Sequence, residues 1–212
     1  NGTEVAATYD SVTGLLTPNV ALVPGTYTLT YQYTDSAGNT GAMSPATTVT
    51  IDTAPVTATV TMSDTALKIG ETATVTVTFS EAVTGFDNAD VTAPNGTLGA
   101  FTSSDGGVTW TATYTPTSDV EAGTNVISLG TGYSDVLGNG GTAATSANYA
   151  VDTKVTAPAA TAAVVADNVG TVTTDVTSGG ATDDTTPSLR VAAPAADETV
   201  HLFVNGTEVA AT

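Results

Sequence analysis

The chain begins and ends with the same eight residues. Residues 1–8 and residues 205–212 both read NGTEVAAT, so the sequence returns to its start after a period of 204 residues. A shorter period of 100 residues lies inside this one, because YTDSAGN at 33–39 is matched by YSDVLGN at 133–139. Fixed periods are typical of repeat proteins, and about 100 residues is the size of an ordinary domain. The sequence therefore predicts an array of domains.

The repeats also predict where the domains divide. IDT at 51–53 recurs as VDT at 151–153, which indicates one complete domain at 53–152. We predict that residues 1–52 are the C-terminal half of a neighbouring domain and residues 153–212 the N-terminal half of the next one. Because the two halves share the octapeptide, we expect the C-terminal half of one copy to complete the N-terminal half of another, head to tail.

The local pattern is that of β-strands throughout. In 72–80 threonine alternates with alanine, valine and phenylalanine, and the same two-residue alternation occurs in 108–114 and 27–33, as expected of half-buried strands. Asn-Gly at 205–206, between two apolar runs, predicts a β-hairpin. The predicted fold class is all-β, a series of Greek-key sandwiches with about seven strands each. Trp110 is predicted to lie at the centre of the middle core.

Composition excludes several classes of function. The net charge is −18, with 21 acidic residues against three lysines and arginines, whereas nucleic acids and anionic membranes attract clustered basic residues. The chain has no cysteine and one histidine, so thiol chemistry is excluded and a Ser-His-Asp triad has little to build on. We therefore expect no enzyme, no nucleic-acid partner and no membrane insertion.

Several segments resemble a known family. SDTALKIGETATVTVTFSEAVTGF at 63–86 and SSDGGVTWTATYTP at 103–116 resemble bacterial immunoglobulin-like (Ig-like) tandem repeats of giant biofilm-associated, RTX-type secreted adhesins. ATDDTTPSLRVAAPA at 181–195 resembles a second repeat type from the same proteins. The resemblance implies tandem Ig-like β-sandwiches, adjacent repeats as partners, an extracellular location at the cell surface or in the biofilm matrix, and calcium between repeats.

Acidic residues are the only side chains here that could form a metal site. In an Ig-type sandwich the B–C and F–G loops lie at the end where the chain enters the domain, so acids of these loops should meet an acid of the linker. Calcium takes six to eight oxygen ligands, and carboxylates with loop carbonyls and water would supply them. Turn formation and solubility are the alternative roles of these acids. The predicted ligands are Asp52, Glu81 or Asp87, and Asp135 at the first junction, and Asp152, Asp197 or Glu198, and Asp35 at the second.

These features together favour a structural role. We expect an extender region of a bacterial surface adhesin whose inter-domain linkers are stiffened by calcium. Two alternatives stay open at this point. One is a self-associating matrix or surface filament, and the other is an Ig-like module that binds a glycan or a protein. A glycan or surface ligand could also be bound by another part of a full-length protein.

Overall fold

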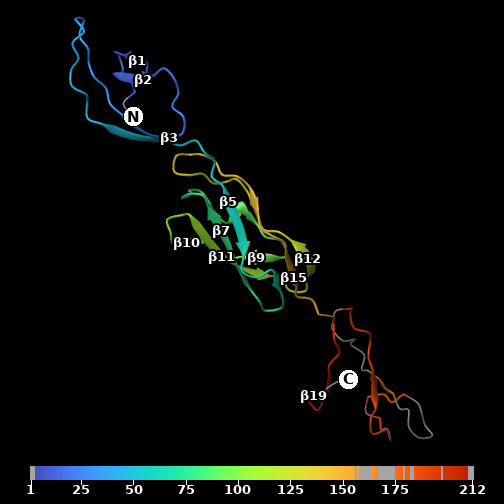
Figure 1. Ribbon diagram of the computed structural model, residues 1–212. Helices are drawn as coiled ribbons and strands as arrows, with labels where there is room; N and C mark the ends of the chain where they lie inside the picture. Colours follow the sequence, from blue (N-terminus) through green and yellow to red (C-terminus); the bar gives the residue numbers. More distant parts are fainter. Residues whose placement is uncertain are drawn as a thin grey trace.

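The computed structural model describes residues 3–155, 157, 164–166, 175–178, 180–181, 184–196 and 198–209. We call 53–152 the middle domain, 3–52 the N-terminal segment, and the described residues from 153 onward the C-terminal segment. In Figure 1 the middle domain lies between the other two, which extend from its opposite ends.

The first sheet of the middle domain is built on the predicted alternating strands. β7 (Ala73–Phe79) pairs antiparallel with β5 (Ala58–Met62) on one side and with β11 (Thr109–Pro116) on the other, and β11 also pairs with β9 (Gly96–Leu98) and β10 (Thr102–Ser103). Along β7 the alanine, valine and phenylalanine side chains are buried while the threonines between them lie on the other face.

The opposite side of the sandwich consists of two three-stranded sheets. In one, β15 (Tyr149–Asp152) pairs antiparallel with β12 (Glu121–Asn125) and parallel with β6 (Ala66–Leu67). In the other, β13 (Ser128–Leu129) lies between β14 (Ala144–Thr145) and β8 (Val91–Thr92). A single turn of 3₁₀ helix, η1 (Asn88–Asp90), precedes β8. The prediction of an all-β, Ig-like fold is confirmed.

The hydrophobic core belongs to the middle domain. Every buried apolar side chain of the described residues lies between Val56 and Val151. At its centre Tyr114 and Tyr149 are fully buried, with ring centroids 5.4 Å apart, and both hydroxyls donate to the carbonyl of Pro94. The division of the chain at 53 and 152 stays a prediction, and the extent of this core agrees with it.

The prediction that Trp110 lies at the centre of the core is wrong. Trp110 is half-buried near one end of β11, where its indole N–H donates to the Gly107 carbonyl at 3.1 Å and its ring packs edge-on against Phe86. A two-residue alternation shows which face of a strand is buried, but it does not show how deep along the strand each residue lies.

The N-terminal and C-terminal segments form separate two-stranded sheets. In the N-terminal segment β1 (Ala7–Asp10) pairs with β2 (Leu15–Pro18), and β3 (Gly25–Leu29) pairs with β4 (Thr47–Ile51). In the C-terminal segment the pairs are β16 (Val164–Ala166) with β17 (Ser188–Arg190), and β18 (Leu202–Val204) with β19 (Thr207–Val209).

The hairpin predicted at 205–206 is confirmed. The turn between β18 and β19 has φ of 52° at Asn205 and 81° at Gly206. Two successive positive φ angles match the right-handed twist of paired strands, and asparagine followed by glycine adopts them at low cost.

Candidate metal centre at the N-terminal end of the middle domain

Three carboxylates meet where the chain enters the middle domain. Asp52, Glu81 and Asp135 each offer one carboxylate oxygen, and these three oxygens lie within 4.8 Å of one another. Two oxygens bound to one Ca²⁺ at about 2.3–2.6 Å can be at most about 5 Å apart, so the spacing fits a shared calcium ion. No other group of three acids or histidines comes together in this way among the residues that the structure describes.

Each acid comes from a different part of the chain. Asp52 directly follows β4, Glu81 follows β7 by two residues, and Asp135 lies in the loop between β13 and β14. Backbone hydrogen bonds hold the three segments together. The Val56 N–H donates to the Gly140 carbonyl at 3.1 Å, and the Thr84 and Ser134 N–H groups donate to each other's carbonyls at 2.8 and 3.1 Å.

The loop 133–141 fixes the Asp135 carboxylate. Its Oδ1 accepts the backbone N–H groups of Leu137 and Asn139, both at 2.8 Å, and its Oδ2 accepts the Asn139 side-chain amide at 2.7 Å. The same amide nitrogen lies 3.3 Å from the Asp52 carbonyl oxygen, to which it also donates. Asn139 therefore joins the loop to the linker. The motif Asp-x-x-Gly-Asn contains Asn139, but only the acids of this motif were predicted as site residues.

Burial and charge act differently on the three acids. Glu81 has a raised pKa because its surroundings desolvate it and because Asp52 and Asp135 are negative neighbours. Asp135 is only 2% exposed, and this desolvation raises its pKa, but the hydrogen bonds from Asn139, Leu137 and Gly138 outweigh the effect and leave the pKa below its usual value. Crowded carboxylates that repel one another are the condition under which a cation binds well.

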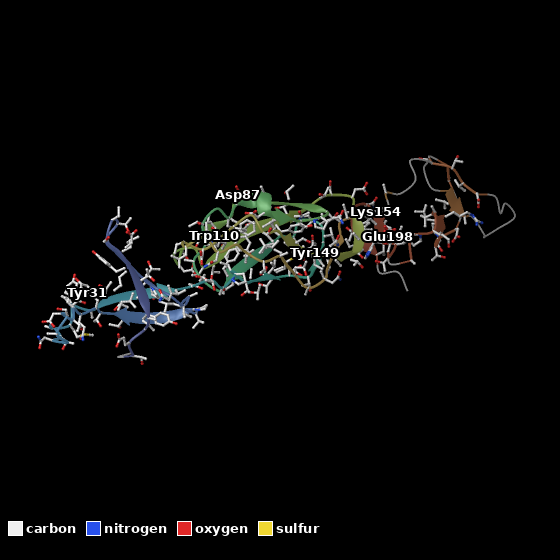
Figure 2. All side chains as sticks on the ribbon, turned by 90° about the horizontal axis from the view of Figure 1, so that it is seen from above. Tyr31, Asp87, Trp110, Tyr149, Lys154 and Glu198 are labelled. Carbon is white, nitrogen blue, oxygen red and sulfur yellow. The ribbon has the colours of Figure 1, made fainter. Side chains whose placement is uncertain are left out.

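Asp87, the alternative to Glu81, has another role. It is the N-cap of η1, where its Oδ1 accepts the Ala89 N–H at 2.7 Å and its own N–H donates to Asp90 Oδ2 at 3.1 Å. Figure 2 shows Asp87 at the outer edge of the middle domain. Val83 and Phe86 turn into the core between Glu81 and Asp87, which separates Asp87 from the cluster.

The described residues of the second predicted junction do not form an acidic cluster. Asp152 and Glu198 line one hollow of about 280 Å³, but Lys68 and Lys154 line it as well and supply opposite charge. Figure 2 labels Lys154 and Glu198, two of the residues around this hollow. Asp35 lies in the N-terminal segment, at the other end of the molecule (Figure 1). Asp197 falls outside the described residues.

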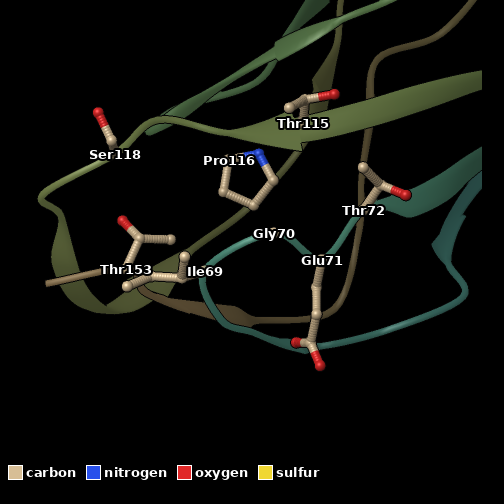
Figure 3. A pocket seen from close by; sticks show the side chains of 8 residues that line it. All are labelled: Ile69, Gly70, Glu71, Thr72, Thr115, Pro116, Ser118 and Thr153. Atoms are coloured by element: carbon tan, nitrogen blue, oxygen red, sulfur yellow. The ribbon is translucent and has the colours of Figure 1, made fainter. Parts of the chain in front are cut away.

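A smaller hollow lies at the end of the middle domain where the chain leaves it. Its volume is about 140 Å³, and Figure 3 shows Pro116 and Ile69 at its walls. Glu71, the only acid among its eight lining residues, accepts the Lys68 N–H at 2.8 Å. These lining residues include no aromatic side chain, so the hollow lacks the flat surface on which a sugar ring stacks. Among the described residues, no helix has the length and hydropathy needed to cross a membrane.

Comparison with known families gives a match over the middle domain. Residues 52–151 match the family model described as a bacterial Ig-like domain. The matched range begins at the linker acid Asp52 and ends at Val151, the last residue of the buried core. No curated protein and no solved structure matches the chain significantly.

Proposed function

We propose, from the match of residues 52–151 to a bacterial Ig-like domain, that the chain is part of an extracellular extender. Domains of this kind often occur in surface proteins. In this proposal the chain is not an enzyme. It holds a more distant part of a bacterial surface adhesin away from the cell, and calcium at the linkers makes it stiff.

One observation carries the proposal, namely the meeting of the linker acid Asp52 with Glu81 and Asp135 of the domain. A short linker between two sandwiches leaves a small interface, so motion between the domains is the default. A cation bound by the linker carboxylate and by two loop carboxylates would tie the linker to the domain. Without the cation, the same three charges would repel one another and loosen the junction.

The calcium affinity should suit the outside of a cell. Extracellular calcium modules bind with Kd of about 10⁻⁴–10⁻³ M. Three carboxylates supply part of the six to eight oxygens that calcium takes, and water and loop carbonyls would supply the others. With such a site the array would stay flexible during export and stiffen outside.

The variant Glu81→Gln should be more stable than the parent chain without calcium and less stable than the parent chain with calcium. In chelator it should be more stable than the parent chain, because it removes a carboxylate whose pKa is raised in the folded state. The cost of ionised Glu81 to folding develops as the pH rises from the ordinary pKa of 4.5 through the raised pKa, so the difference should be absent below 4.5 and complete above the raised pKa. In calcium it should be less stable than the parent, because one ligand is lost.

Calcium titration calorimetry at neutral pH measures the affinity directly. We expect Glu81→Gln to weaken binding by about tenfold or more, since ligand charge sets the affinity of such sites. Asp87→Asn is the matched control, because it also removes one acid, while asparagine is an equally good N-cap for η1. Equal affinities for the parent and Glu81→Gln would exclude calcium binding at this cluster.

A further inference from the structure

The N-terminal segment contains a second copy of the loop at the candidate metal centre. In the loop 33–41, Asp35 Oδ1 accepts the N–H groups of Ala37 and Asn39 at 2.9 and 2.8 Å, and its Oδ2 accepts the Asn39 side-chain amide at 2.9 Å. These are the hydrogen bonds of the loop 133–141, shifted by 100 residues. The two loops therefore have the same local fold.

The surroundings of the two loops differ. Tyr133 is 3% exposed, and its ring packs against Phe79 at 4.7 Å and Phe86 at 6.3 Å, whereas its counterpart Tyr33 is 78% exposed. Phe79 and Phe86 belong to the first half of the middle domain. The N-terminal segment thus has the second half of a sandwich, and its apolar face lacks the cover that a first half gives.

The C-terminal segment corresponds to the other half of a domain. β18 and β19 form a two-stranded hairpin whose apolar side chains Leu202 and Val209 are about two-fifths exposed, at 40% and 43%. An isolated two-stranded hairpin is marginally stable in water. By the order of the repeats this segment corresponds to the first half of a domain, the half that the N-terminal segment lacks.

The repeated octapeptide sets the register in which the two halves fit. Val209 pairs with Leu202, and Val209 is the same position as Val5 in the other copy of the octapeptide. Tyr9 pairs with Leu16 in the N-terminal segment. On one continuous strand from residue 3 to residue 10, Val5 and Tyr9 lie on the same face.

This register brings apolar side chains of both segments together on one face. Leu202, Val5, Tyr9 and Leu16 would all lie on the first face, since directly paired residues of antiparallel strands point to the same side. The other face is mixed: it receives Glu208, whose carboxylate is hydrogen-bonded to His201 at 2.6 Å, together with Phe203, which pairs directly with Glu208. The register therefore matches the two segments through their shared apolar face.

We propose that the N-terminal segment of one copy of this chain and the C-terminal segment of a second copy complete one β-sandwich. The two segments of a single molecule extend from opposite ends of the middle domain (Figure 1), so they do not meet within it. The contact joins two different surfaces, and such head-to-tail contacts propagate into a filament. Where several repeats follow one another in a polypeptide, the same two halves meet through the chain.

The complete sandwich also brings Asp35 of one copy toward Asp152 of the other. β3 and β4 lie next to the middle domain of their own copy, and the two chain segments that connect them to the Asp35 loop run away from that domain. These segments stay paired, because Ser44 donates its N–H to the Tyr31 carbonyl and Gly41 donates its N–H to the Tyr33 carbonyl. The loop therefore faces the end at which the preceding copy leaves its middle domain, near Asp152. The arrangement matches that in the middle domain, where the loop that holds Asp135 faces the linker residue Asp52.

Sedimentation of the full chain over a range of concentrations tests the proposal. We expect an average mass that rises beyond that of a dimer as concentration increases, both in calcium and in chelator. Leu16→Asp should block the N-terminal segment and Leu202→Asp the C-terminal segment. Because the contact needs one intact segment of each kind, each variant alone should stay monomeric. Val12→Asp, at a 93% exposed turn position, should behave like the parent.

A mixture of the two blocked variants distinguishes this contact from other kinds of association. Leu16→Asp retains an intact C-terminal segment and Leu202→Asp an intact N-terminal segment, so the mixture should form a one-to-one dimer and nothing larger. A parent chain that stays monomeric, or a mixture with no dimer, would overturn the proposal.

Discussion

Adding calcium to about 10 mM should raise the melting temperature of the middle domain by about 6–20 °C. An ion present at about 10–100 times its Kd stabilises the folded state by about 1.4–2.7 kcal/mol. For a domain of about 100 residues, 1 kcal/mol corresponds to about 4–8 °C. Trp110 is the only tryptophan of the chain and lies in the middle domain, so its fluorescence follows the transition of this domain alone.

Sodium chloride at the same ionic strength is the control for this result. General screening would reduce repulsion among the 21 acidic residues with either salt. A specific site responds to calcium and loses the response in Glu81→Gln. An equal rise in sodium, or an unchanged rise in the variant, would assign the effect to screening.

Tyr133→Ala should destabilise the middle domain by about 3–5 kcal/mol, the range for removing a large buried aromatic side chain. Tyr133 packs against Phe79, and its hydroxyl donates to the Thr142 carbonyl at 2.7 Å. Its ring also lies against Gly141, where a β-carbon would overlap it. The side chain therefore closes the core beneath the loop that holds Asp135.

Tyr33→Ala is the matched control for the loss of stability expected in Tyr133→Ala. The two tyrosines occupy the same position of the same motif, but Tyr33 is exposed, and exposed substitutions usually change stability by no more than about 0.5 kcal/mol. Urea unfolding followed by Trp110 fluorescence measures the stability of the middle domain in both variants, and Tyr33→Ala, which lies outside this domain, should leave its transition unchanged. A loss below about 1 kcal/mol for Tyr133→Ala would contradict the burial described here.

Periodicity in the sequence predicted much of the fold. The alternation in 72–80 became β7, that in 108–114 became β11, and Asn-Gly at 205–206 became the turn of a hairpin. These features depend on neighbouring residues alone. The depth of Trp110 depends on where β11 lies over the opposite sheets, which no local pattern encodes.

The candidate site could be predicted in part. The repeated motif around Asp35 and Asp135, with the usual place of loops in an Ig-type sandwich, led to Asp52, Glu81 and Asp135 as neighbours. The sequence left Glu81 and Asp87 as alternatives, because the choice depends on the chain between them turning into the core. The place of Lys68 near Asp152 was not predicted, since Lys68 lies 84 residues away along the chain and lines the same hollow as Asp152 only in the folded protein.

The central claim is that calcium stiffens the junction at Asp52, and the width of a distance distribution across that junction tests it most directly. The chain has no cysteine, so Thr28→Cys in β3 and Thr74→Cys in β7, both exposed, can carry two spin labels. The labelled chain is diluted with an excess of unlabelled chain, so that each distance comes from one molecule. Pulsed electron spin resonance should give a narrow distribution in calcium and a broad one in chelator, and Glu81→Gln should stay broad in calcium while Asp87→Asn narrows. A distribution of the same width in calcium and in chelator would contradict the account.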